Sequence, residues 1–303
     1  MSDNTEFRKE LEERTKQINE QIESYLPEEK GHQKTIFEAM NYSVKAGGKR
    51  LGPLFMQEIC RLFTGEVQPV VVPFMAAIEM IHTSSLVHDD LPCMDDDMMR
   101  RGQASTWAEY GEDMGVLAGD ALMIYAFEVA AKAFKEVSDA DDLKRVGRAI
   151  EILASKTGIY GMIGGQTVDV ELAGGPIPKN KLDFIYRLKT GALIEASMLI
   201  GAVLGGAAEE DCKIVESLAG KVGLAFQIQD DILDVTGDQE VLGKEAGSDE
   251  KNQKTTYVTL EGLEKAKKDV EALSVQAIED LNKLPGNNEF LENLIRILIK
   301  RQK

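Results

Sequence analysis

Apolar residues recur every three or four positions along most of this 303-residue chain, the spacing that places side chains on one face of an α-helix. Residues 3–25 show it first, with Phe7, Leu11 and Ile18 at helical intervals before Pro27 ends the segment. We find no convincing strand alternation, no linker and no internal repeat. The pattern therefore predicts a single all-α domain over residues 1–303.

Prolines and glycines indicate where the other helices should begin and end. A proline disfavours helical backbone in the residue before it, so the helix that follows Pro73 should end near Leu91. We expect helices over residues 33–46, 51–63, from the Pro69–Pro73 turn to Leu91, 104–134 with a break near Gly111, 141–158, 179–205, around 226–234, 255–284 and 288–301. Residues 237–254 should form a polar loop.

Composition and charge narrow the class of partner. The chain is 43% hydrophobic and 29% charged, as globular proteins are, and its net charge of −17 argues against nucleic acid or an anionic membrane surface. Cys60, Cys93 and Cys212 form no disulfide framework or zinc-ligand spacing, so a cytoplasmic setting is the simplest expectation. The most apolar segment that we identified, Met198–Ala208, is shorter than the roughly 20 residues of a membrane span.

The densest chemistry lies in residues 78–101. Five aspartates fall within nine positions, and an arginine pair follows: Asp89, Asp90, Asp95, Asp96, Asp97, Arg100 and Arg101. Each carboxylate pair at about 4–6 Å costs on the order of 1 kcal/mol even in water, so a cation should relieve the repulsion. Mg²⁺ is typically held by one or two carboxylates plus substrate phosphates, and guanidinium groups match phosphate oxygens. The segment therefore predicts a metal–diphosphate ligand.

A second acidic cluster follows at residues 226–234, where Asp230 and Asp234 share one helical face. Acidic faces are usually solvated and paired with basic residues, but none occurs here between Lys221 and Lys244. Two such clusters could hold a diphosphate through several metal ions, which would act as Lewis acids as the diphosphate leaves. The chain has no Walker A motif, which disfavours a P-loop nucleotide enzyme.

Three further features have both structural and functional interpretations. Lys49 follows a glycine pair that could be an ordinary helix C-cap with solvated basic residues. Lys189 lies in an apolar helix, where an unpaired cation is costly but a lysine can also extend to the surface. His82 is most simply a core histidine, although it lies two helical turns from Asp89 on the same face.

With these motifs in order, the chain resembles the short-chain trans-polyprenyl diphosphate synthases of the farnesyl and geranylgeranyl type. The family's first acidic motif, DDxxxxD, is read here as Asp89-Asp90-LPCM-Asp95, and the second, DDxxD, as Asp230-Asp231-IL-Asp234. The GGKR, Lys-Thr, GGQxxD, Phe-Gln and LGK…GSD elements match in the same order, so the resemblance covers nearly the whole chain.

The resemblance implies an isoprenoid-synthase-type bundle of ten or more helices around a deep central cavity, usually as a homodimer. It implies head-to-tail condensation of isopentenyl diphosphate with dimethylallyl, geranyl or farnesyl diphosphate: the allylic bond ionises, the isopentenyl double bond attacks, and the released diphosphate takes a proton. The implied ligands of three Mg²⁺ ions are Asp89, Asp95 and Asp230, with Asp234 acting through water. The implied allylic-diphosphate residues are Arg100, Lys189, Thr190, Gln227 and Lys244, and the isopentenyl-diphosphate residues are Lys49, His82 and Arg101.

The residue five before the first aspartate forms the floor of the product cavity in this family, and farnesyl-specific bacterial members resemble one another in having an aromatic there. Here it is Ser84, with Ser85 beside it and the bulky Met80 and Ile81 one turn deeper. One helical turn is about 5.4 Å, close to one isoprene unit, so the expected product is geranylgeranyl diphosphate. A neighbouring helix could instead fill the space and leave farnesyl diphosphate as the product.

One departure and three alternatives remain open. The family usually has GGKRLRP, but the second arginine is Gly52 here, so one isopentenyl-diphosphate contact is expected to be missing unless Arg50 replaces it. A terpene cyclase or a head-to-head prenyl synthase shares the aspartate chemistry. A non-catalytic subunit of a heteromeric synthase is a third alternative, against which the intact aspartates count.

Overall fold

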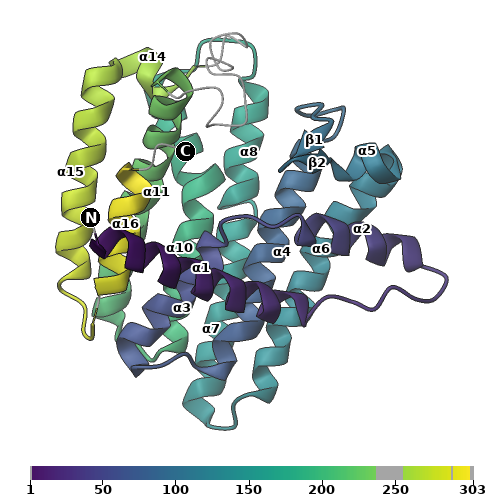
Figure 1. Cartoon of the computed structure of the whole chain (residues 1–303), viewed down its shortest axis with the longest axis horizontal. Coiled ribbons are helices and arrows are strands. Elements are labelled where there is room, and N and C mark those ends of the chain that lie inside the picture. The colour runs from purple at the N-terminus through teal and green to yellow at the C-terminus, as the bar shows by residue number, and fades with distance from the viewer. Residues whose placement is uncertain (1, 237–254, 288, 301–303) are drawn as a thin grey trace. The chain divides into compact units, whose positions relative to one another are not determined.

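The computed structural model describes residues 2–236, 255–287 and 289–300, and helices account for most of them (Figure 1). This confirms the all-α class. The described strands β1 (Met99–Arg100) and β2 (Gln103–Ala104) form a small antiparallel hairpin, too short to give an alternating pattern in the sequence. Backbone contacts divide the chain into two compact units, residues 1–150 and 151–303, each described by itself below. The single domain remains a prediction.

The first unit is built around α4. Its elements are α1 (Ser2–Glu23), α2 (Lys34–Lys45), α3 (Leu51–Thr64), the 3₁₀ turn η1 (Pro69–Val71), α4 (Val72–Asp89), the hairpin, α5 (Thr106–Tyr110), α6 (Glu112–Ala131), η2 (Lys132–Lys135) and the start of α7 (Ala140–Thr157). Helix α4 packs along α6 and is also contacted by α1, α2 and α3. It is therefore apolar on nearly every face, and the described residues 73–81 are all buried.

Two helical stretches of the first unit are long and apolar enough, by length and composition, to cross a membrane. They are Pro69–Asp89 and Glu112–Lys135, and their apolar windows of 18 residues are 78% and 39% buried within the protein, respectively. Both are longer than Met198–Ala208, the apolar segment that the sequence pattern indicated. Because the core helix of a folded domain meets the same criteria, the burial of α4 accounts for its composition without a membrane.

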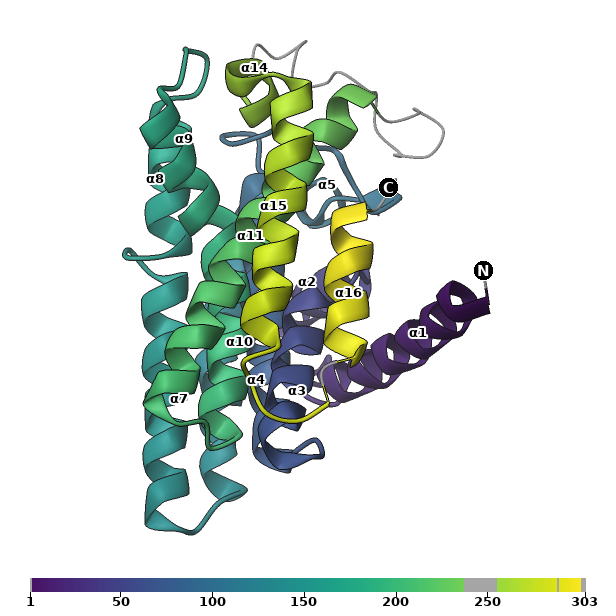
Figure 2. The ribbon, with the colours of Figure 1, turned by 90° about the vertical axis from the view of Figure 1, so that its left-hand side faces the viewer.

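The second unit contains the rest of α7, α8 (Met162–Glu171), α9 (Lys179–Ile185), the π-helical segment η3 (Tyr186–Gly191), α10 (Ala192–Leu204), α11 (Glu209–Thr236), α14 (Tyr257–Glu261), α15 (Leu263–Leu281) and α16 (Glu289–Lys300). Helix α11 packs between α10 and α15, and Figure 2 shows α15 running alongside it. Apart from the half-buried Leu193, every residue of α10 is buried. Helix α11 also approaches η3 closely, because a Cβ on Gly223 would lie 3.0 Å from the Cα of Gly191.

Glycine and proline positions predicted most helix ends correctly. Helix α4 begins with Pro73 in its first turn, where a missing N–H costs nothing, and Gly111 separates α5 from α6 as expected. Several features differ from the prediction. Helix α8 was not expected, and α11 begins at Glu209, well before residue 226. The continuous helix expected over residues 255–284 is interrupted at Gly262, whose φ is +85°, and residues 179–205 include a π-helical turn.

Candidate functional site

The first acidic cluster lies where α4 ends. Asp89 is the last residue of the helix and is half-buried, while Asp95 is exposed on the loop that follows. The amide of Asp95 donates to the carbonyl of Asp89 at 2.9 Å, and the amide of Asp97 donates to the carbonyl of Asp90 at 3.1 Å. These bonds fold the loop back onto the helix end. The backbones of the two predicted metal-ligating residues, Asp89 and Asp95, are therefore adjacent.

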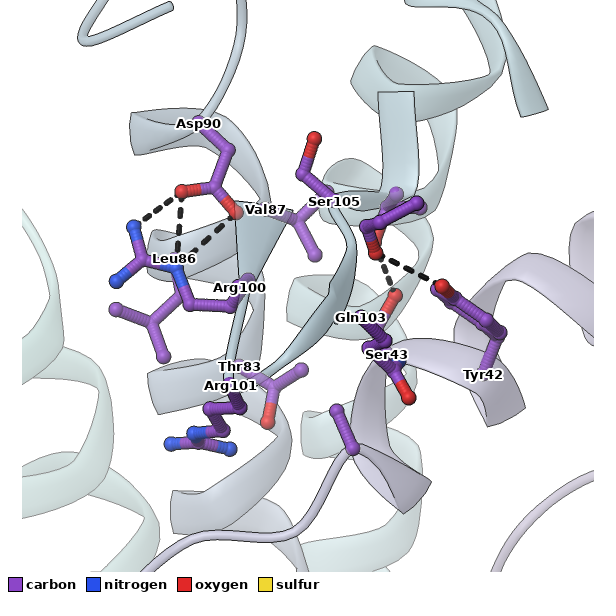
Figure 3. Close-up of a pocket in the computed structure, with 13 residues that line it drawn as sticks. Tyr42, Ser43, Thr83, Leu86, Val87, Asp90, Arg100, Arg101, Gln103 and Ser105 are labelled. Atoms are coloured by element: carbon purple, nitrogen blue, oxygen red, sulfur yellow. Dashed lines mark hydrogen bonds and ion pairs between the residues drawn. The ribbon is translucent and has the colours of Figure 1, made fainter. Parts of the chain in front are cut away.

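The second aspartate of this cluster holds the first arginine of the hairpin. Asp90 is only 2% exposed, and its carboxylate accepts hydrogen bonds from Nε of Arg100 at 3.0 and 3.2 Å and from Nη2 (Figure 3). Burial raises the pKa of Asp90 and the bonds from Arg100 oppose that rise; the same bonds raise the pKa of Arg100. The arginine that was predicted to bind allylic diphosphate is thus fixed in orientation by Asp90.

The second arginine lies against the glycine pair. Arg101 has a positive φ of 54° and donates from Nη1 to the carbonyl of Gly47. Its guanidinium covers Gly48: a Cβ on that residue would lie 2.7 Å from Nη2 and 2.8 Å from Cζ. Gly48 therefore leaves room for Arg101, and the role of this arginine in binding isopentenyl diphosphate stays a prediction.

The structure also relates His82 and Lys49 to this arginine. Burial lowers the pKa of His82, the positive charge of Arg101 acts in the same direction, and the carboxylate of Glu79 opposes both. The imidazole is therefore neutral near pH 7. Lys49 is exposed and follows Gly48 in the loop that Arg101 contacts. All three residues predicted for isopentenyl diphosphate thus belong to the first unit.

Arg50 has a structural role that the sequence did not reveal. It is 3% exposed and adopts a left-handed conformation with φ of 49° before α3 begins. Its guanidinium forms a buried ion pair with Glu79 at 2.5 Å and donates to Asn19 and to the carbonyl of Val44, each at 2.6 Å. Since Arg50 holds the glycine loop onto α4, it does not replace the arginine missing at Gly52.

In the second unit, close packing of α8 on η3 positions Lys189 and Thr190. A Cβ on Gly165 would lie 2.3 Å from the backbone nitrogen of Lys189, so only glycine allows this approach. The ammonium of Lys189 pairs with Asp169 at 2.7 Å, which explains how a cation is tolerated in this apolar stretch. Single π-helical turns occur often at functional sites, and here the turn contains Lys189 and Thr190, two of the five residues that were predicted to bind allylic diphosphate.

The second acidic cluster occupies the last two turns of α11. Asp230 is exposed, and Gln227 and Asp234 are half-buried. Asp231 accepts hydrogen bonds at one oxygen, Oδ2, from the hydroxyl of Tyr186 at 2.6 Å and from the backbone amide of Tyr257 at 2.7 Å. Neither tyrosine was predicted to have a role. The sequence did contain a signal that Asp231 differs from its neighbours, because the helical face shared by Asp230 and Asp234 does not include Asp231.

The residues present suit magnesium. The donors in both clusters are carboxylate oxygens, the hard ligands that Mg²⁺ prefers. Within the described residues, no three His, Cys, Asp or Glu side chains converge on one point. This fits an ion that is held by one or two carboxylates and completed by substrate phosphates. Lys244, which was also predicted to bind diphosphate, lies outside the described residues.

The predicted floor residues are in the core of α4. Ser84, Met80 and Ile81 have no exposed surface, and Ser85 is half-buried. The hydroxyl of Ser84 donates to the carbonyl of Ile81 at 2.8 Å, so the helix itself satisfies this small polar side chain. An aromatic side chain is absent from this position, as the sequence indicated.

A cavity of about 20 Å³ lies between α2, the last turns of α4 and the hairpin (Figure 3). Among the described residues, nothing forms a hydrogen bond with the buried hydroxyls of Thr83 and Ser105, which lie at opposite ends of the cavity lining. Tyr42 donates to the carbonyl of Ala104 at 2.8 Å and fixes the hairpin to α2. The space holds about one water molecule and no isoprenoid substrate, so the cavity belongs to the scaffold behind the two arginines.

Comparisons with known proteins agree with this geometry. Residues 33–293 match the model of the polyprenyl synthetase family. The chain is 45% identical to a chloroplastic geranylgeranyl pyrophosphate synthase of Catharanthus roseus over 81% of this chain and 68% of that protein. It is 39% identical to the farnesyl diphosphate synthase of Escherichia coli over 98% of this chain and 100% of that protein.

A solved structure extends the likeness to the fold. The geranyltransferase of Helicobacter pylori, complexed with magnesium and isoprenyl diphosphate, superposes with a TM-score of 0.78 at 32% identity, over 94% of this chain and 95% of that one. The family model covers most of the chain, and the relatives are prenyl diphosphate synthases. The chain therefore belongs to the polyprenyl synthetase family and is a short-chain prenyltransferase of the geranylgeranyl and farnesyl diphosphate synthase type.

Proposed function

We propose that this protein is a geranylgeranyl diphosphate synthase, which condenses isopentenyl diphosphate head-to-tail with dimethylallyl, geranyl and farnesyl diphosphates. The relatives include both farnesyl and geranylgeranyl enzymes, so the family alone leaves the product length open. The observation that carries the proposal is the small size of the side chain at Ser84, the floor position of α4. Farnesyl diphosphate is the product if the floor lies elsewhere.

In this proposal two sets of residues bind the two substrates. Lys49, His82 and Arg101 bind isopentenyl diphosphate. The allylic diphosphate is bound by Arg100, Lys189, Thr190, Gln227 and Lys244. The ion pairs of Arg100 with Asp90 and of Lys189 with Asp169 support these roles, because each cation is already oriented by a carboxylate of its own unit.

Asp89, Asp95 and Asp230 would bind the metal directly, with Asp234 acting through water. Bound magnesium, three ions in this proposal, supplies the positive charge that stabilises the departing diphosphate. Arg100 and Lys189 would each add fixed positive charge that stabilises the allylic diphosphate as its bond ionises. Apolar helix surface shields the resulting cation from water until the isopentenyl double bond attacks, and the released diphosphate then accepts the proton.

Alanine variants of Asp89 and Asp230 test the two clusters together. Each should lower turnover by orders of magnitude, since about 1.4 kcal/mol of lost transition-state stabilisation already corresponds to tenfold. Circular dichroism and the unfolding midpoint check that the fold is retained. Near-normal turnover of either variant in excess Mg²⁺ would show that its cluster is not part of the metal site.

Product analysis tests the chain length. The unmodified protein, given isopentenyl diphosphate with dimethylallyl or farnesyl diphosphate, should release a 20-carbon product. A tyrosine in place of Ser84 closes about one helical turn, roughly 5.4 Å or one isoprene unit, so Ser84→Tyr should release farnesyl diphosphate. Met80 and Ile81 would then no longer limit the length. An unmodified protein that releases farnesyl diphosphate and does not extend it would refute the proposed product.

Gly52 is expected to weaken isopentenyl-diphosphate binding. Because Arg50 is buried against Glu79, an arginine restored at position 52 should add a contact that the protein lacks. A charge-assisted hydrogen bond contributes roughly 1.5–3 kcal/mol, so Gly52→Arg should lower the KM for isopentenyl diphosphate about tenfold or more. An unchanged KM would mean that another residue already fills the role.

A homodimer is the proposed assembly, with α6 at the contact. Helix α6 is apolar but leaves large side chains exposed, including Leu117 and Ile124, the latter 72% exposed. A second copy that packs α6 against α6 would cover both. Sedimentation should give twice the monomer mass, and Ile124→Lys should give the monomer; a monomeric unmodified protein would refute the dimer. The cytoplasmic location is part of the same proposal and agrees with the free thiols of Cys60, Cys93 and Cys212.

The alternatives give different results in one assay of the purified chain alone. A terpene cyclase would release hydrocarbon or alcohol from an allylic diphosphate without consuming isopentenyl diphosphate. A head-to-head synthase would join two allylic substrates. A non-catalytic subunit would show no turnover until a partner chain is added.

A further inference from the structure

The two aspartates of the second pair differ in what surrounds them. Asp230 is exposed on α11, whereas Asp231 is half-buried beside η3 and the first residue of α14. We propose that Asp231 is a positioning residue, which joins α11, η3 and α14 through Tyr186 and Tyr257, and that it is not a ligand of the metal–diphosphate group. The role of Asp230 rests on the proposed function. The contacts of Asp231 with Tyr186 and Tyr257, called the joint below, are observed in the structure and do not depend on that function.

Three atoms form the joint. Oδ2 of Asp231 accepts from the hydroxyl of Tyr186 at 2.6 Å and from the amide of Tyr257 at 2.7 Å, and that amide also lies 3.3 Å from the Tyr186 hydroxyl. Distances of 2.5–2.7 Å are typical of hydroxyl donors to an ionised carboxylate, and such bonds are about twice as strong as neutral ones. The carboxylate of Asp231 thus binds donors within the protein, the Tyr186 hydroxyl and the Tyr257 amide.

The two donor residues, Tyr186 and Tyr257, are also fixed by surroundings other than Asp231. Tyr186 is the first residue of η3 and is buried. Tyr257 is buried, its hydroxyl donates to Asp269 at 2.7 Å, and its ring lies beneath the ammonium of Lys179 at 4.7 Å. The joint therefore connects rigid elements, as a positioning role requires.

The position of the joint gives it a consequence for the site. Helix α11 carries Asp230, and η3 carries Lys189 three residues after Tyr186. Asp231 therefore fixes the segment that was predicted to bind diphosphate relative to the carboxylate that was predicted to bind metal. The first pair shows the same division within its own unit, since Asp90 is buried against Arg100 while Asp89 ends the helix.

Amide hydrogen exchange in metal-free buffer tests the joint without any catalysis. The exchange rate of the Tyr257 amide should rise roughly tenfold or more in Asp231→Ala, the factor that one charge-assisted hydrogen bond provides. Asp230→Ala is the matched control and should leave that rate unchanged. Tyr186→Phe removes one donor and should raise the rate severalfold, which keeps the test informative if Asp231→Ala does not fold. An unchanged rate in both Asp231→Ala and Tyr186→Phe would overturn the joint.

Calorimetric titration with Mg²⁺ and inorganic diphosphate tests the second half of the proposal. Asparagine keeps an oxygen that can accept both bonds but is a poor Mg²⁺ ligand, so Asp231→Asn should bind within about threefold of the unmodified protein. Asp230→Asn should bind at least tenfold more weakly. Equal weakening in the two variants would make Asp231 a metal ligand and overturn the proposal. If Asp230→Asn alone retained full binding, the proposed metal site would fail while the exchange result still stood.

Discussion

Replacing Gly48 by alanine separates a role in binding from a role in folding. An alanine Cβ at this position would lie 2.7–2.9 Å from the guanidinium atoms of Arg101, closer than carbon and nitrogen can approach. Gly48 also has a φ of +137°, where residues with a side chain are strained. Gly47 is a matched control, because its φ is +83° and its Cβ would meet no atom within 4 Å.

The backbone strain and the clash with Arg101 should affect different measured quantities. Positive φ should destabilise both variants by about 1–2 kcal/mol. The clash at Gly48 involves the flexible end of a side chain, so it is relieved by moving Arg101 and adds little to the loss of stability. In the proposed function Arg101 contacts a phosphate, and its displacement would lose an interaction worth roughly 1.5–3 kcal/mol, or about ten- to hundredfold in the KM for isopentenyl diphosphate.

Urea unfolding and initial rates at saturating allylic substrate measure the two effects. Gly47→Ala and Gly48→Ala should lose similar stability, while only Gly48→Ala should raise the KM for isopentenyl diphosphate. In an Arg101→Ala background, Gly48→Ala should have no further effect on that KM. An equal rise in the KM for isopentenyl diphosphate in both glycine variants, or no rise in either, would refute the inference that Gly48 leaves room for Arg101.

Three further outcomes follow from buried contacts. Gly165→Ala places a Cβ against backbone that cannot move aside and should destabilise the protein by about 1–3 kcal/mol in urea unfolding. Gly147→Ala, on an open face of α7, should not destabilise the protein. Equal effects of the two changes would contradict the close packing. Glu79→Gln leaves the buried charge of Arg50 without its counter-ion and should cost about 3–5 kcal/mol, and a loss under 1 kcal/mol would contradict this. Burial raises the pKa of Asp280, but hydrogen bonds from Lys221, Lys283 and Ser217 outweigh this and lower it from 3.8 to about 2. The stabilising contribution of Asp280 is therefore complete above pH 3.8 and is lost as the pH falls through about 2, and the stability difference from Asp280→Asn should vanish over that range.

Local signals predicted most of the helical architecture. Pro73, Gly111 and the glycine pair before α3 each fix an element boundary through the backbone, and the sequence shows such constraints directly. The break at Gly262 was missed because a single glycine within a helical pattern is usually tolerated. The pairing of β1 with β2 depends on tertiary contacts and has no local signature.

The candidate site was predicted as a set of residues but not as a set of partnerships. The resemblance to the family, carried by its motifs, predicts Asp89, Arg100 and Lys189 as site residues. It does not reveal that Arg100 is held by Asp90 or that Arg50 is buried, because burial of a charged group depends on a partner that is distant in sequence. Charged residues are most simply expected at the surface, and Arg50 departs from that expectation.

The π-helical turn makes this region sensitive to chain length. A π-helix holds more residues per turn than the 3.6 of an α-helix, so η3 contains surplus chain between α9 and α10. Deleting one residue between Tyr186 and Lys189 would allow a regular helix but would change the angle between these two side chains about the helix axis. Either Tyr186 would leave Asp231 or Lys189 would leave Asp169. Such a deletion would give a more regular helix and a poorer enzyme, so this segment should tolerate substitution at its exposed positions far better than any change in its number of residues.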